Sequence, residues 1–92
     1  MTLSKTQTKR IQRDIDRIEF LIARRKNQKA MFDQAVAVGL KIYEDNKEKF
    51  SEEEIKQLEE LRQENERLLE QIAGQITDLE TELHEANQRI KA

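Results

Sequence analysis

The only histidine of the chain, His84, follows Glu80 by four residues. On a helix this spacing puts both side chains on one face, where they could supply two ligands to a metal ion. A tetrahedral site needs more ligands, and the Glu-x-x-His pairs of di-iron bundles are missing because residue 81 is a threonine. We therefore predict no metal and no cofactor, and interpret His84 as a solvated surface residue.

Nucleophilic or phosphate-binding chemistry has equally little support in the sequence. Ser4 lies in a polar segment, and Ser51 is placed to cap a helix, so neither forms a Ser-His-Asp set. Gly39 and Gly74 lie inside helical patterns and lack the strand and glycine cluster of a phosphate loop. We expect Gly39 near a helix seam, where it would allow close approach of another helix. The chain is predicted not to be an enzyme.

One surface feature does suggest binding chemistry. Arginines and one phenylalanine follow one another at spacings of three or four along a single helix face, which we call the basic ridge: Arg10, Arg13, Arg17, Phe20, Arg24 and Asn27. Arginine and aromatic side chains are common anchors at protein interfaces, so we predict that the ridge binds another protein through an acidic surface. Nucleic acid is a less favoured partner, because the sequence pI is about 5.5. The alternative without a binding role is an ordinary solvated face, with Phe20 buried at the dimer contact.

The elements that carry the ridge follow from composition. About half of the 92 residues are Ala, Glu, Lys, Leu and Arg, and proline is absent, which is typical of long helices or coiled coils. The formal net charge of −2 hides an asymmetry along the chain. Residues 1–30 carry +6, residues 31–50 carry −1 and residues 51–92 carry −7. A chain folded back on itself would place the basic segment beside the acidic one.

The sequence around Ser51 marks the start of a second helix. Ser51 and Glu54 are spaced for a capping box, in which the serine accepts from a free backbone N–H and the glutamate reaches back to the serine N–H. Apolar residues then recur at spacings of three and four, with Arg62 and Asn65 in two of the positions. These apolar residues are Ile55, Leu58, Leu69, Ile72, Ile76, Leu79, Leu83, Ala86 and Ile90.

The first half has a less regular pattern. Four isoleucines form a seam over the first turns, and the next apolar cluster restarts with a different phase. The two sets are Ile11, Ile15, Ile18 and Ile22, and then Met31, Ala35, Val38 and Ile42. With no proline or glycine between them, we favour one continuous helix. Three helices with a break near Asn27 are the alternative.

We therefore predict one all-α domain over residues 1–92, an antiparallel two-helix coiled-coil hairpin. Its helices should cover about 4–46 and about 51–91, with a connection at 47–50. Because one hairpin buries few apolar groups, we expect a homodimer, most simply a four-helix bundle. The expected oligomerisation seam is Ile15, Ile18, Ile22, Leu69, Ile72, Ile76, Leu79 and Leu83.

The expected function is a non-enzymatic coiled-coil protein-protein interaction module, acting as an assembly factor, adaptor or inhibitor. A nucleic-acid-binding accessory protein that uses the basic ridge is the first alternative, and a purely structural spacer, roughly 60 Å long, in a larger assembly is the second. The chain has no cysteine and no apolar leader, and its apolar runs are far shorter than the roughly 20 residues that span a bilayer. We therefore expect no transmembrane segment and a cytoplasmic location.

Overall fold

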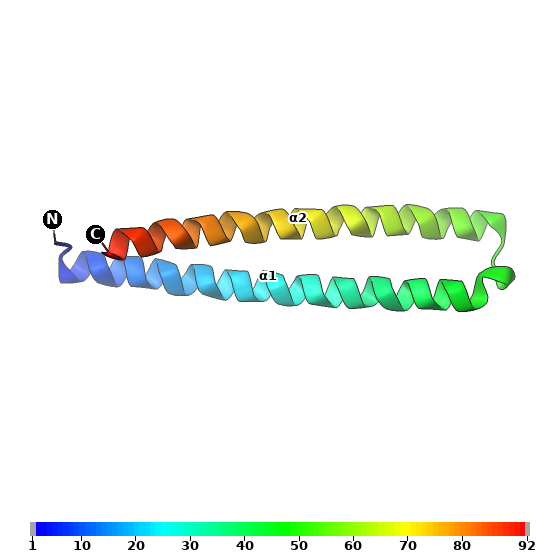
Figure 1. Cartoon of the computed structure of the whole chain (residues 1–92), viewed down its shortest axis with the longest axis horizontal. Coiled ribbons are helices and arrows are strands. Elements are labelled where there is room, and N and C mark those ends of the chain that lie inside the picture. Colours follow the sequence, from blue (N-terminus) through cyan, green and yellow to red (C-terminus); the bar gives the residue numbers. More distant parts are fainter. Residues whose placement is uncertain (1, 92) are drawn as a thin grey trace.

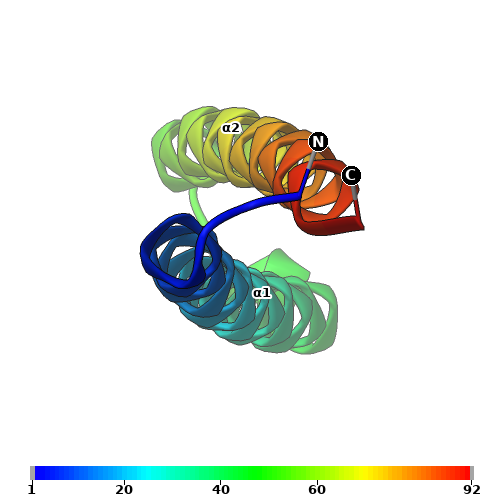
Figure 2. The same ribbon diagram turned by 90° about the vertical axis from the view of Figure 1, so that its left-hand side faces the viewer.

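Two long helices joined by a short turn form an antiparallel hairpin. In the computed structural model, which describes residues 2–91, helix α1 spans Lys5–Asn46, the 3-10 helix η1 spans Lys47–Lys49 and helix α2 spans Glu52–Lys91. The Cα atoms extend over 68 × 15 × 14 Å, and both ends of the chain lie at one end of the rod (Figure 1). Viewed along the rod, the two helices twist gently about each other (Figure 2). The prediction of an all-α hairpin of two long helices is confirmed, and dimerisation stays a prediction.

Helix α1 is continuous through residues 24–29, so the alternative with three helices is wrong. The polar side chains of this stretch find partners on the helix surface. Arg25 donates to the side chain of Gln28 at 3.0 Å, and the Lys29 ammonium lies 3.2 Å from the Asp33 carboxylate. With no proline or glycine to interrupt the backbone ladder, the helix has no local reason to stop there.

The helix starts are fixed by serine caps. Ser4, which lies in a polar segment of the sequence, forms a full capping box with Gln7: its hydroxyl accepts from the Gln7 N–H, and its own N–H donates to the Gln7 side chain. At α2, the Ser51 hydroxyl accepts from the Glu54 N–H at 3.2 Å as predicted. The Glu54 carboxylate, however, accepts from the Ser51 hydroxyl at 3.0 Å rather than from its backbone.

The chain reverses direction without glycine. The side-chain amide of Asn46, the last residue of α1, donates to the Ile42 carbonyl one turn back at 2.8 Å. Beyond η1, the ring of Phe50 stacks on Tyr43 with centroids 5.9 Å apart. This aromatic contact ties the connection to the last turn of α1.

The best-packed part of the hairpin lies in the half that holds the chain ends. All six apolar residues that are buried within residues 2–91 belong to this half: Ile15, Ile18, Ile22, Ile72, Ile76 and Ala86. Toward the connection, the facing side chains are half-buried or, as at Leu58 and Arg62, exposed. The hairpin therefore has a tight half near its ends and a looser half near its turn.

Charge does not pair the helices directly. The four ion pairs found among residues 2–91 all join side chains three or four residues apart on one helix. The basic start of α1 does lie beside the acidic α2, as the charge pattern predicted. The attraction between the basic start of α1 and the acidic α2 acts between exposed groups at longer range, where water and salt screen it.

The inner seam of α1 keeps one phase from end to end. After Ile22 it continues in steps of three and four through Arg25, Lys29, Phe32, Val36, Gly39 and Tyr43, all half-buried except the exposed Gly39. The predicted restart of the seam is therefore wrong, because Met31, Val38 and Ile42 are more than half exposed and Ala35 is exposed. Arg25 and Lys29 fit at seam positions since their stems lie along the seam while their charged ends reach polar partners.

Gly39 falls on this seam but does not bring the helices close together. A methyl group added at Gly39 or at Gly74 would meet no atom within 4 Å. The expectation of close approach at Gly39 is therefore wrong. Its missing side chain leaves space instead, in the looser half of the hairpin.

The contrast between buried and exposed positions on α1 can be tested at two neighbouring residues. Ile18→Ala should lower the free energy of unfolding by about 2 to 5 kcal/mol, because Ile18 is 4% exposed and its loss leaves a cavity. Phe20→Ala should change it by less than about 0.5 kcal/mol, because Phe20 is 64% exposed. Urea titration followed by circular dichroism measures both, and equal losses would contradict the observed phase of the helix.

Replacing either helical glycine should stabilise the hairpin. Gly39→Ala and Gly74→Ala should each raise the free energy of unfolding by about 0.5 to 1 kcal/mol, because alanine restricts the unfolded chain and meets no steric obstacle here. Thermal melts of the two single variants provide matched controls for each other. A loss of stability in Gly39→Ala alone would mean that another surface approaches Gly39 closely.

Candidate interaction surface

The basic ridge is exposed along its whole length. All six of its residues lie on the part of α1 that faces away from α2. Among residues 2–91, its arginines make a single ion pair, between Arg17 and Asp14 at 4.0 Å, with side chains that are 68% and 57% exposed. The guanidinium groups of Arg10, Arg13 and Arg24 thus have no carboxylate partner within the described chain. The structure leaves their charge and donors available to solvent or a ligand.

Phe20 lies within this row of arginines. An exposed phenylalanine ring keeps a large apolar area in water, since aromatic side chains bury 150–250 Å² when they are covered. Its neighbours one turn away on either side are Arg17 and Arg24, so the ring has charged groups around it and no apolar pocket of its own. The predicted partner-binding residues therefore do share one open surface.

A second surface, which sequence reasoning assigned to the core, continues the ridge along α1. We call it the apolar stripe: Met31, Ala35, Val38 and Ile42. Ridge and stripe share one column of the helix, which in steps of seven reads Arg10, Arg17, Arg24, Met31 and Val38. The column changes from cationic to apolar between Arg24 and Met31, at the boundary between the tight and the loose half of the hairpin. The unbroken three-four spacing of the seam from Ile11 to Tyr43 was the signal that could have placed the stripe outside.

The loose half also contains a small hollow between the helices. Its volume is about 140 Å³, and Val36, Gly39, Tyr43, Leu58 and Arg62 are among the residues that line it. Pockets that hold drug-sized ligands usually measure about 300 to 1,000 Å³. The hollow is thus too small for such a ligand.

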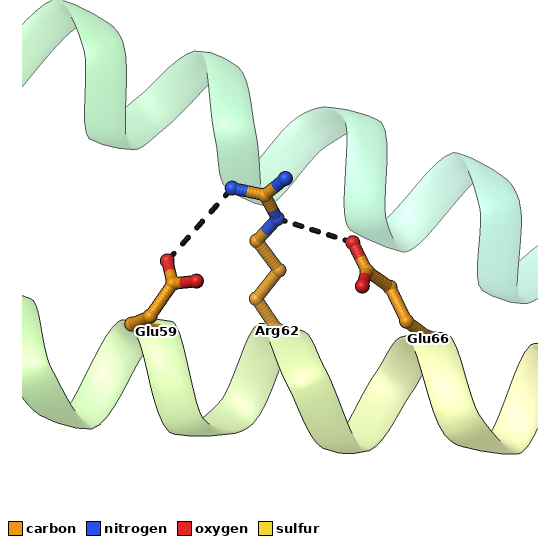
Figure 3. Close-up of polar contacts among 3 residues, drawn as sticks. All are labelled: Glu59, Arg62 and Glu66. Atoms are coloured by element: carbon orange, nitrogen blue, oxygen red, sulfur yellow. Dashed lines mark hydrogen bonds and ion pairs between the residues drawn. The ribbon is translucent and has the colours of Figure 1, made fainter.

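Arg62 borders this hollow from a seam position of α2. Its side chain extends toward α1, and its guanidinium is held by two carboxylates of its own helix (Figure 3). Glu59 lies 3.8 Å and Glu66 3.3 Å from it, and all three side chains are about half exposed. The arginine thereby occupies a seam position with its charge compensated at the helix surface, as snorkelling side chains do.

The residues predicted for the oligomerisation seam face the other helix of the same chain. Five of them are buried and three are half-buried: Ile15, Ile18, Ile22, Ile72 and Ile76, and then Leu69, Leu79 and Leu83. One chain is therefore enough to cover most of this seam. Whether it also contacts a second chain stays a prediction.

Two searches of the described residues address metal and membrane binding. Between residues 2 and 91 no group of three or more His, Cys, Asp and Glu side chains is arranged to hold a metal ion, and both Glu80 and His84 are exposed. In the same range neither helix contains a stretch long and apolar enough to cross a membrane.

The geometry defines the class of protein as an all-α antiparallel helical hairpin that exposes apolar side chains along its length. Comparison of the chain with protein-family models, with curated proteins and with solved structures finds no match. The surfaces of the hairpin are therefore the only basis for inferring its function.

Proposed function

We propose that the chain is a non-enzymatic protein-protein interaction module, an assembly factor, adaptor or inhibitor that acts through contacts of its helix faces. The observation that carries this proposal is the ridge itself. The exposed Phe20 shares one open face with three arginines that have no ion-pair partner in the described chain. These are Arg10 and Arg13 before it and Arg24 after it. Exposure of the Phe20 ring to water costs free energy. A partner that covers the ridge would bury this ring and accept charge-assisted hydrogen bonds from the arginines.

The chemistry of the ridge favours an acidic protein surface as partner. From Arg10 to Arg24 it extends about 21 Å along the helix, which suits a patch of several carboxylates on one folded partner. Arginine can pair with carboxylates through two parallel hydrogen bonds, and an aromatic ring in their midst supplies an apolar anchor. These are the residue types in which binding energy at protein interfaces concentrates.

The remainder of the molecule disfavours nucleic acid. The chain has a net charge of −2, and the acidic α2 runs alongside the ridge over its full length (Figure 1). A polyphosphate that followed α1 would be repelled by the twelve acidic residues after Phe50. An acidic protein patch of limited extent can contact the ridge without approaching α2.

The proposal is tested by removing the ridge without disturbing the hairpin. The triple variant Arg13→Ala, Arg17→Ala and Phe20→Ala should lose at least ten-fold in affinity for partners captured from the native host, because the anchors are removed. Helicity and melting temperature should be unchanged, since all three residues are exposed. Quantitative pull-down with mass spectrometry measures the loss.

A matched control removes two positive charges elsewhere. Lys56→Ala with Arg67→Ala changes exposed residues of α2 and should leave partner capture intact.

Fluorescence anisotropy with random duplex and single-stranded DNA tests the nucleic-acid alternative. Binding at about 50 mM salt that weakens steeply by 200 mM and disappears in the triple variant would replace the proposal with the nucleic-acid alternative.

A further inference from the structure

In the loose half, the apolar stripe belongs to a wider side of the hairpin that carries few charges. Leu21 of α1 and Gln75 of α2 line the same surface hollow, so these two residues mark one side of the helix pair. Steps of seven from Leu21 lead to Gln28, Ala35 and Ile42. The same steps from Gln75, taken toward the connection, lead to Leu68 and Leu61, of which Leu61 is 54% exposed. Both helices therefore contribute apolar side chains to the same side of the loose half.

The opposite side of the loose half has a different character. Lys26, Asp33 and Ala73 line a hollow there, and steps of seven from Ala73 toward the connection lead to Glu66 and Glu59. Charged residues thus occupy one side and are largely missing from the other. Depletion of charge at the centre of a patch is the compositional signature of a buried protein interface.

The charges at the two ends of the stripe are opposite in sign. The column that holds Met31 and Val38 continues to Arg24 at one end and to Asp45 at the other. Within residues 2–91 neither Arg24 nor Asp45 belongs to an ion pair. A surface with an apolar centre and opposite charges at its two ends is complementary to itself when one copy is turned end for end.

We propose that the apolar stripe is the docking surface for a second copy of this chain, which lies antiparallel on it. In this arrangement Met31 faces Ile42 of the second copy, and Ala35 faces Val38. Asp45 then lies within one helical turn of Arg24 of the second copy, which a guanidinium can span. A parallel arrangement of α1 on α1 would instead place Arg24 against Arg24 and Asp45 against Asp45, which costs free energy.

The dimensions of the surface are sufficient for a dimer. From Arg24 to Asp45 the column is about 32 Å long, and two packed helices are about 20 Å wide. The resulting flat footprint is roughly 600 Å² per copy, and the uneven surface of the side chains adds to the area buried. Ordinary stable interfaces bury roughly 800 Å² per partner. Tight packing of Met31, Val38, Ile42 and Leu61 would place these side chains at the centre of a four-helix segment.

The docking surface goes beyond the proposed function, because its occupant is a second copy and it shares only Arg24 with the binding residues of the basic ridge. The overlap uses the half of the hairpin near the connection, so Arg10, Arg13, Arg17 and Phe20 of the two copies stay exposed at opposite ends of the dimer. Failure of one proposal therefore does not imply failure of the other. The ridge variant should dimerise normally.

Sedimentation velocity on the full chain tests the docking surface. At 100 µM the chain should sediment as a dimer, at twice the 10.9 kDa of one chain. The variant Val38→Glu with Ile42→Glu should dissociate to a monomer, with an affinity at least 100-fold lower, while its helicity is retained. The control Ala30→Glu with Ala37→Glu adds the same charge to exposed positions of α1 outside the stripe and should stay dimeric. A monomeric wild-type chain at 100 µM, or a dimeric Val38→Glu/Ile42→Glu variant, would overturn the proposal.

Disulfide trapping tests the orientation, and the absence of native cysteine makes it clean. A mixture of Met31→Cys and Ile42→Cys chains should form a mixed disulfide dimer under mild oxidation. Each variant alone should not, because equivalent residues of antiparallel copies would be eleven residues, or about 16 Å, apart along the helix, beyond the reach of a disulfide. Efficient cross-linking of Ile42→Cys to itself would show a parallel dimer and would refute the antiparallel arrangement.

Discussion

The contact between the isoleucines of α1 and those of α2 is the constraint on which the rest of the hairpin depends. A buried isoleucine contributes about 1.5 to 3 kcal/mol, whereas an exposed ion pair contributes about 0 to 1 kcal/mol. Ile15, Ile18 and Ile22 therefore set the rotation of α1 about its axis, with Ile72 and Ile76 opposite. Once that rotation is fixed, every other column of α1 has an assigned direction. The ridge and the apolar stripe point outward as a consequence.

Much of the fold could be predicted from the sequence, because composition, the spacing of apolar residues and capping residues all indicate long helices. The seam of α2 and the start of that helix at Ser51 followed from local patterns alone. The phase of the second half of α1 did not, because two adjacent rows both have the spacing of a seam. One row is apolar and contains Met31 and Val38, and the other contains Arg25 and Lys29. Local hydrophobicity favours the first row, but the rotation set by the isoleucines selects the second.

Of the two candidate surfaces, the basic ridge could be predicted from the sequence and the apolar stripe could not. The ridge stands opposite a seam that the sequence defines clearly, so its exposure followed directly. The stripe lies beside a seam position, where a rotation of one residue exchanges inside and outside. The partner could not be inferred, since arginines and one phenylalanine specify a chemistry of contact and not an identity. The opposite charges of Arg24 and Asp45 indicate a self-complementary surface only when the stripe between them is known to be exposed.

The uneven packing of the hairpin also bears on how it folds. The buried residues of α1 and α2 are 50 to 71 positions apart along the chain, whereas Tyr43 and Phe50 are separated by only seven. Closing a long loop costs more entropy than closing a short one. We therefore expect contacts near the turn to form before those near the chain ends, so that the serine cap and the aromatic stack affect mainly the folding rate and the isoleucines mainly the unfolding rate.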